Sequence, residues 1–205
     1  MFVSGAKLVA KTIDDPVVGA AWGSDSVLEY QSIGSLAGHL ARGGVWVVEE
    51  YLDQGVPEGP PDFDSAGHYF AAVMDEADEG VHAGIRARGA YLAEQGWEDI
   101  VEKLNAATAS IERRLAEEPS DRLVEVFDGK VMRLDDYLLT RIVEQVVHLD
   151  DLARSLERAA PRFVPGSVQL TIACAMEIGR RRHGDVELMR SLFRGQPTDV
   201  VPVLG

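Results

Sequence analysis

The most informative segment of the sequence runs from Asp136 to Leu156 and contains Arg141-Ile-Val-Glu144-Gln-Val-Val-His148-Leu-Asp-Asp151. Apolar residues recur along it at the spacing of three and four that is typical of one face of a helix. These residues are Leu138, Leu139, Ile142, Val143, Val146, Val147, Leu149 and Leu152. The pattern predicts a helix that is largely buried, and we expect Asp135 or Asp136 to cap its first turn.

Glu144 and His148 are four residues apart, so they share one face of this predicted helix, together with Arg141 and Asp151. A buried carboxylate without a partner is costly, and a divalent cation is one partner that satisfies both a Glu oxygen and a His nitrogen. The alternative is an exposed ion pair, which the same spacing produces often. A metal site needs a third ligand from another helix.

His39 is the candidate for that third ligand. It lies in Ile33-Gly-Ser-Leu-Ala-Gly-His-Leu-Ala41, within a second predicted helix that Ser32 caps and Gly55 ends. The small residues Gly38, Ala41 and Gly43 would let a neighbouring helix approach closely. The alternative is an ordinary core histidine whose hydrogen bonds are satisfied within the protein.

Outside these two helices, the chain reads as further helices with short connections. The N-terminal helical region, Ser4 to Trp22, should break near Asp15 because the residue before a proline disfavours the α conformation. A connection follows over 22–31, a loop over 55–64, and a long helical region from Ser65 to Glu118 with a break near Gly96.

The spacing of apolar residues changes once in the C-terminal half, from a helical pattern to one typical of strands. Asp128-Gly129 lies between apolar, β-branched residues, which predicts a hairpin within 123–134, with an irregular connection as the alternative. After the central helix we expect helices at Ser167–His183 and Asp185–Arg194, and an extended tail over 197–205 that could add an edge strand. The fold class is therefore all-α: a four-helix bundle with a short hairpin or extended connection and extra C-terminal helices. We divide it into a bundle over 1–160 and an extension over 161–205 that packs on the bundle.

Composition narrows the function classes. The chain of 205 residues has 20 Lys and Arg against 34 Asp and Glu, a net charge of −14, so nucleic acid and anionic membranes are not expected partners. The single cysteine, Cys174, excludes an internal disulfide. No long apolar run spans a membrane and no signal peptide is apparent, so we expect a cytoplasmic protein.

These motifs resemble the DinB-like (DinB/YfiT-like) metal-binding bundles, and most closely the branch that includes mycothiol-dependent maleylpyruvate isomerase. The resemblance covers about residues 5–160. It rests on Trp22 and Ser26, on Leu36-Ala-Gly-His39-Leu40 as an "LxxHL" motif, and on Glu144 to Leu152 as an "ExxxHxxDL" motif. It implies that His39, Glu144 and His148 ligate a divalent metal, zinc first, with Ni²⁺ or Fe²⁺ as alternatives that the same ligands admit.

The resemblance also implies a reaction. Three protein ligands leave a coordination position open, which either a water or a thiol can occupy, and a coordinated thiol is deprotonated at neutral pH. We therefore expect a thiol transferase or isomerase with mycothiol, or another low-molecular-weight thiol, and a small electrophilic substrate. The isomerase has a further α/β domain for which we expect no room in 205 residues, so its specific reaction does not follow. A homodimer is also expected.

Two other functions stay open. The bundle could be a metal-binding module of stress response or ligand binding without turnover. It could also be a purely structural bundle in which His39 never meets Glu144, which a separation above about 7 Å would select.

Several residues have expected roles of their own. Arg141 either orients Glu144 or binds an anionic substrate, with a surface ion pair as the alternative, and Asp151 could accept the second imidazole N–H of His148. Cys174 reads as a small core residue. The cations of Arg180-Arg181-Arg182 could pair with the acidic stretch 53–79, which has eight acids and no Lys or Arg. His68 could line a pocket, whereas His82 and His183 have no partner at a ligand spacing.

Overall fold

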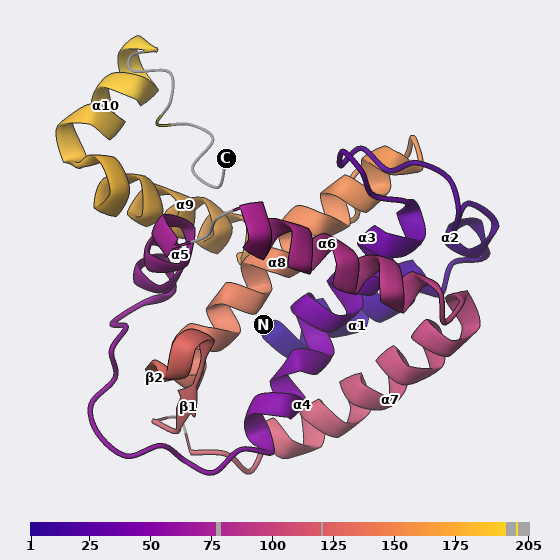
Figure 1. The fold of residues 1–205 in the computed structure, drawn as a ribbon, viewed down its shortest axis with the longest axis horizontal. Helices are drawn as coiled ribbons and strands as arrows, with labels where there is room; N and C mark the ends of the chain where they lie inside the picture. The colour runs from indigo at the N-terminus through magenta and orange to yellow at the C-terminus, as the bar shows by residue number, and fades with distance from the viewer. Residues whose placement is uncertain (77–78, 120, 196–199, 201–205) are drawn as a thin grey trace.

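A computed structural model describes residues 1–76, 79–119, 121–195 and 200 of the chain. In these residues the protein is helical apart from one two-stranded sheet, which confirms the all-α class (Figure 1). The longest helices are α8 (Leu134–Ser155), α7 (Trp97–Leu115) and α9 (Ser167–His183). Among the residues described, no helix is both long enough and apolar enough to cross a membrane.

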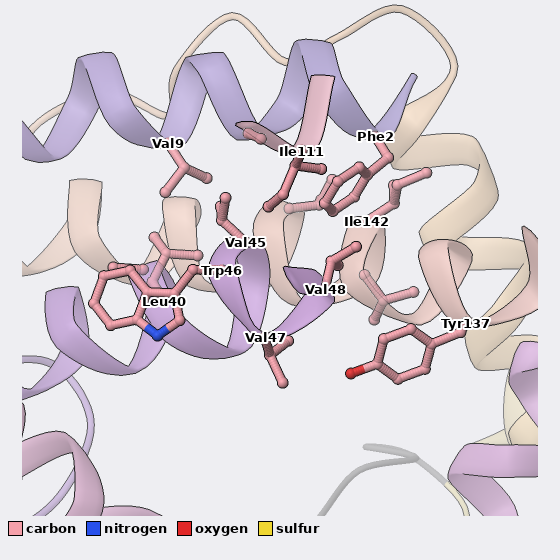
Figure 2. Close-up of a cluster of buried hydrophobic side chains, with 14 of the residues drawn as sticks. Phe2, Val9, Leu40, Val45, Trp46, Val47, Val48, Ile111, Tyr137 and Ile142 are labelled. Atoms are coloured by element: carbon pink, nitrogen blue, oxygen red, sulfur yellow. The ribbon is translucent and has the colours of Figure 1, made fainter. Parts of the chain in front are cut away.

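Four helical segments form the bundle: α1 (Phe2–Ile13), the segment 33–52, α7 and α8. Each contributes apolar side chains to one core. Figure 2 shows this core, and its buried residues include Phe2, Val9, Leu40, Val45, Val48, Ile111 and Ile142. The apolar spacing read from the sequence thus corresponds to faces that meet in one interior, which is the arrangement expected of a bundle.

The N-terminal break occurs where proline requires it. Helix α1 ends at Ile13, and α2 (Pro16–Ala20) begins after Asp15, whose side chain accepts a hydrogen bond from the Val17 amide. The following connection returns the chain to the bundle, and the Ser32 hydroxyl caps the next helix by accepting the Ser35 amide at 3.0 Å. Both features were predicted.

The second helix has the predicted extent but not the predicted regularity. It consists of α3 (Ile33–Ala41), a π-helical turn over Arg42–Trp46, and α4 (Val47–Leu52). A π-turn is wider than an α-turn because its backbone hydrogen bonds reach five residues back, and such turns occur frequently at functional sites. This one begins three residues after His39.

The region 65–118 contains three helices, α5 (Ala66–Glu76), α6 (Glu79–Ala93) and α7, so the expected single break near Gly96 was incomplete. Gly96, with a φ of 94°, is the N-cap of α7, and α6 ends three residues before it at Ala93. Helix α6 packs against α3, whereas α5 lies beside α9 (Figure 1). The approach of α6 is close at Gly38, where a Cβ would lie 2.9 Å from the Cβ of Leu92.

The hairpin is confirmed. Strand β1 (Leu123–Glu125) pairs antiparallel with β2 (Val131–Arg133), and Val124 lies opposite Met132. Between them, η2 (Phe127–Gly129) has φ of 56° at Asp128 and 69° at Gly129. Positive φ at both central positions is the turn geometry that favours Asp-Gly.

The predicted cap of α8 was wrong. The helix begins at Leu134, and Arg133 precedes it without a side-chain capping bond. The reason is that β2 leads directly into α8, and the Leu134 amide donates to the Arg122 carbonyl at 2.8 Å. Asp135 and Asp136 lie in the first turn instead, where a carboxylate interacts favourably with the helix dipole.

The C-terminal helices α9 and α10 (Asp185–Arg194) have the predicted bounds. Helix α9 packs against α5 and α8. Arg181 pairs with Asp64 at 2.8 Å, as expected for contact between these arginines and the acidic stretch. The tail expected to be an edge strand lies outside the described residues except for Val200, which is buried.

Candidate metal centre

Three side chains from two helices meet at the predicted site. His39 comes from the last turns of α3, and Glu144 and His148 come from adjacent turns of α8. Glu144 Oε2 lies 3.3 Å from His39 Nε2 and 3.4 Å from His148 Nε2. One ligand atom from each residue lies within 4.8 Å of the others, so the interpretation of a bundle in which His39 never meets Glu144 is wrong.

The two contacts to Glu144 have the spacing of two ligands on one metal ion. Zinc binds His nitrogen and carboxylate oxygen at about 2.0–2.2 Å, so two ligands of a tetrahedral ion lie about 3.3 Å apart. The two contacts to Glu144 have this separation and are longer than the usual N–H···O hydrogen bond of about 2.7–3.2 Å. The side chains of His39, Glu144 and His148 are about one fifth exposed, at 22, 20 and 19%. The cluster is therefore dry enough to favour ligation yet accessible to an ion.

The π-turn fixes where His39 lies relative to α8. Its carbonyl groups accept hydrogen bonds from two side chains of α8 that are four residues apart. Arg141 Nη1 donates to Gly43 O at 2.8 Å, and Gln145 Nε2 donates to Gly44 O at 2.9 Å. These two donors join the turn that begins three residues after His39 to the helix that carries Glu144 and His148. We call Arg141, Gln145 and their two carbonyl acceptors the π-turn clamp.

Gln145 also contacts α1. It is buried, and a Cβ placed on Gly5 would overlap its side-chain carboxamide. The amide of Gln145 therefore fills the space that a glycine leaves on α1, while its nitrogen donates to the π-turn. Three elements of the bundle meet at this one side chain.

Opposing effects set the charge state of Glu144. Burial alone would raise its pKa, but the close polar contacts with His148 and His39, together with the nearby charge of Arg141, hold the pKa well below its usual value. Glu144 is therefore an anion at neutral pH. Anionic oxygen is the form that binds a divalent cation.

His148 has the opposite shift. Burial lowers its pKa, but the hydrogen bond to Asp151 and the interactions with Glu144 outweigh this and raise the pKa to about 9. His148 Nδ1 lies 3.0 Å from Asp151 Oδ2, so the carboxylate accepts its N–H and leaves Nε2 facing Glu144. A carboxylate behind a ligating imidazole is the arrangement that orients the ring and raises its basicity in metal sites.

A cavity of about 470 Å³ adjoins the cluster. His39 and Glu144 lie in its wall, together with the π-turn, α5, α6, the tip of the hairpin and α8. Its aromatic lining residues are Tyr51, Tyr69, Phe70, Phe127 and Tyr137. Burial raises the pKa of Tyr69, and that of Tyr137 well above its ordinary value, so both phenols stay protonated at neutral pH.

Arg141 lies in the wall of this cavity and is 8% exposed, which excludes the surface ion pair that was one sequence interpretation. Its Nε donates to Thr140 Oγ1 at 2.9 Å, and its guanidinium lies 4.9 Å from the centre of the Tyr137 ring. Within the described part of the chain, Nη2 has no hydrogen-bond partner and no carboxylate lies within ion-pair distance of Arg141.

The other singled-out residues lie away from the cluster. Trp22 donates to Ala93 O at 3.0 Å, and the Ser26 hydroxyl accepts the Leu28 amide, so both organise the connection before α3. Cys174 is buried, and burial raises its pKa to about 11. His68 contacts Asp64 at 3.1 Å. The side chain of His82 lies outside the described residues.

Sequence reasoning missed Gln145 and the tyrosines of the cavity. Ile142 and Leu149, one helical turn before and after Gln145, belong to the apolar stripe, and an amide there needs a partner that the helix cannot supply. Together with Gly43-Gly44 in the middle of the second helix, that was a signal for a side chain donating to an irregular turn. The tyrosines gave no such signal, because they come from three separate segments.

Comparison with known proteins shows the family of the chain. Neither the curated proteins nor the solved structures include a match to it. Residues 10–153 match the family described as the mycothiol maleylpyruvate isomerase N-terminal domain. The matched range contains His39, Arg141, Glu144, His148 and Asp151, and it ends before α9. The chain therefore belongs to the mycothiol maleylpyruvate isomerase N-terminal domain family.

Proposed function

We propose that the protein is a divalent-metal-dependent thiol transferase or isomerase that uses a low-molecular-weight thiol such as mycothiol. His39, Glu144 and His148 would hold the ion. The observation that carries this proposal is that one anionic oxygen, Glu144 Oε2, lies within 3.4 Å of two imidazole nitrogens beside a cavity. The family name supports the choice of thiol.

Zinc is the expected ion, and nickel or iron would fit the same ligands. When bound, the ion would lower the pKa of a coordinated thiol, so that the thiol reacts as a thiolate at neutral pH. The protein's own residues prepare this site. Asp151 accepts the Nδ1–H of His148 and so directs Nε2 towards the ion, and the π-turn clamp fixes the place of His39.

Arg141 would receive an anionic group of the electrophilic substrate. Its charge is permanent, it lies in the cavity wall, and Nη2 is not used by the described residues. The phenol of Tyr69, in the same wall, stays protonated and can donate a hydrogen bond to the substrate or supply a proton to it. Addition of the thiolate to an unsaturated carbon followed by its loss gives isomerisation, and displacement of a leaving group gives thiol transfer.

The test is an assay of thiol consumption with the zinc-loaded protein. Mycothiol, bacillithiol and glutathione are each combined with a panel of electrophiles, both unsaturated acids and acids with a leaving group. We expect turnover with one thiol, and a loss of at least about a hundredfold in His148→Ala. His68→Ala is the matched control, because His68 also contacts a carboxylate but lies outside the cluster.

Absence of turnover with every thiol and electrophile, in protein that binds one metal ion per chain, would contradict the enzymatic proposal. That result would select the alternative, a metal-binding module of stress response or ligand binding without turnover. Absence of metal binding would contradict both.

A further inference from the structure

The outer part of the cavity has apolar side chains that are open to solvent. Phe127, at the tip of the hairpin, is 39% exposed, and Ile85 of α6 is 38% exposed, yet both line the cavity. We call these two residues the apolar mouth. They come from segments more than forty residues apart in the sequence, and both belong to the same cavity lining. Apolar surface of this kind gains free energy when a ligand covers it.

The inner part of the cavity is different. Arg141 is buried there without an ion-pair partner among the described residues, beside Glu144 and His39. Two other arginines line the cavity, but Arg42 pairs with Glu50 at 2.7 Å and Arg88 is exposed on α6. A buried charge is costly when it has no counter-charge, so Arg141 is the position where an anion gains most on binding.

Several further side chains of the cavity wall are apolar. They include Val47, Phe70, Val73 and Leu92. The volume of about 470 Å³ lies within the range of small-molecule sites, which is about 300–1,000 Å³. A small, wholly polar substrate would leave these walls and the apolar mouth uncovered.

We infer that the electrophilic substrate is an amphiphilic acid, in which a carboxylate binds Arg141 and an extended alkyl or aryl arm lies along the apolar walls to the mouth. This inference deepens the proposed function and rests on it, because the reacting carbon must lie near the carboxylate, beside the metal ligands. The specificity-determining residues for the arm are Phe127 and Ile85.

The test uses unreactive ligands, so that binding is measured without turnover. Straight-chain carboxylates from butanoate to decanoate are titrated calorimetrically into the full chain, once loaded with zinc and once metal-free. We expect the affinity to increase about twofold to fourfold per methylene until the chain passes the mouth. In Phe127→Ser and Ile85→Ser the increase should stop at shorter chains.

A control variant tests whether the carboxylates bind non-specifically to exposed apolar side chains. Phe193→Ser removes a phenylalanine that is 74% exposed on α10, away from the cavity, and should leave the chain-length dependence unchanged. An affinity that does not depend on chain length, or a dependence that Phe193→Ser abolishes and Phe127→Ser does not, would overturn the inference.

The acid end is tested separately. Octanoate should bind at least about tenfold more tightly than octanamide, and Arg141→Gln should remove this preference while Arg88→Gln retains it. Equal binding of acid and amide by the unmodified protein would overturn the role of Arg141, whether or not the Arg141 variant folds.

The measurements distinguish failure of this inference about the substrate from failure of the proposed function. The chain-length dependence is measured with and without zinc, whereas the proposed function depends on metal binding and thiol turnover. A flat chain-length series with normal turnover would contradict only the inference about the substrate. A normal series without zinc binding would contradict the proposed function.

Discussion

At the scale of single residues, Glu144 is the residue that contacts both other members of the cluster, His39 and His148. Its Oε2 is shared by the Nε2 atoms of His39 and His148, so both imidazoles face the same anion. His148 is in turn held from behind by Asp151. This chain of contacts predicts how the cluster responds to pH.

His148 should make the stability of the metal-free protein fall at alkaline pH. Its pKa is raised from 6.5 to about 9 in the folded protein, so the folded state binds this proton more tightly than the unfolded state. The resulting stability is fully present below pH 6.5 and is lost as the pH rises through about 9. Urea unfolding between pH 6 and 10 measures it, and His148→Gln should lack this loss. The same alkaline loss in His148→Gln would contradict the assignment.

Zinc affinity should change with pH in the opposite direction. A ligating imidazole must release the proton that His148 holds up to about pH 9, so zinc binding should tighten as the pH rises towards 9 and should release protons. Calorimetry in two buffers of different ionisation enthalpy measures the number released. Affinity that is independent of pH between 6 and 9 would contradict ligation through His148.

Cys174 should be unreactive in the folded protein. Burial raises its pKa to about 11, so at pH 8 the thiolate fraction is about two orders of magnitude below that of a free cysteine. Alkylation by iodoacetamide, followed by mass spectrometry, should be at least about a hundredfold slower in the folded than in the unfolded chain. Rapid labelling of the folded protein would make Cys174 a candidate nucleophile and remove the need for an external thiol.

At the scale of elements, the π-turn is the feature that places the third ligand. It begins three residues after His39, and two of its carbonyls accept hydrogen bonds from Arg141 and Gln145 on α8. Since both donors lie on the helix that carries Glu144 and His148, the distance between the two ligand-bearing elements is fixed next to the site.

Loss of Gln145 should affect both stability and metal binding. In Gln145→Ala the buried carbonyl of Gly44 loses its donor, which costs about 1–3 kcal/mol of unfolding free energy. The π-turn is then held by Arg141 alone, so zinc affinity should fall by at least about tenfold. Denaturant unfolding and zinc titration measure the two effects. Unchanged zinc affinity in a destabilised variant would show that the clamp only supports the fold.

Gly5 should show energetic coupling to Gln145. In Gly5→Ala the added methyl overlaps the Gln145 carboxamide, so we expect a loss of about 1–3 kcal/mol. In the Gln145→Ala background the overlap is absent, and the same substitution should cost much less. A double-mutant cycle by denaturant unfolding measures this coupling, and additive effects would contradict the contact.

At the scale of the whole molecule, the helical period and turn residues predicted most of the architecture. Boundaries between elements occur in the structure at positions where the residue type constrains the local backbone, namely Pro16, Ser32, Asp128-Gly129 and Gly184. The capping prediction at Asp135 failed because β2 leads into α8, which is a tertiary effect. The split of 66–93 into α5 and α6, which pack against different helices, likewise depends on contacts distant in sequence.

The candidate site also has one part that the sequence predicts and one part that it does not. His39, Glu144 and His148 were predictable, because two of them share a helix face and the third lies in a motif with the family's spacing. The cavity was not predictable, since its walls come from α5, α6, the hairpin and α8. The net charge of the chain does not predict the residues that line the cavity either. The chain carries −14, yet three arginines line this one cavity.

Metal stoichiometry tests the three-ligand site most directly. The full chain is dialysed against a chelator and then against buffered zinc, and bound zinc is measured by elemental analysis. A site with these three ligands predicts one zinc ion per chain in the unmodified protein and in His68→Ala, and close to none in His39→Ala, Glu144→Ala and His148→Ala. Unmodified protein that binds no zinc, or a His148→Ala variant that retains a full equivalent, would contradict it.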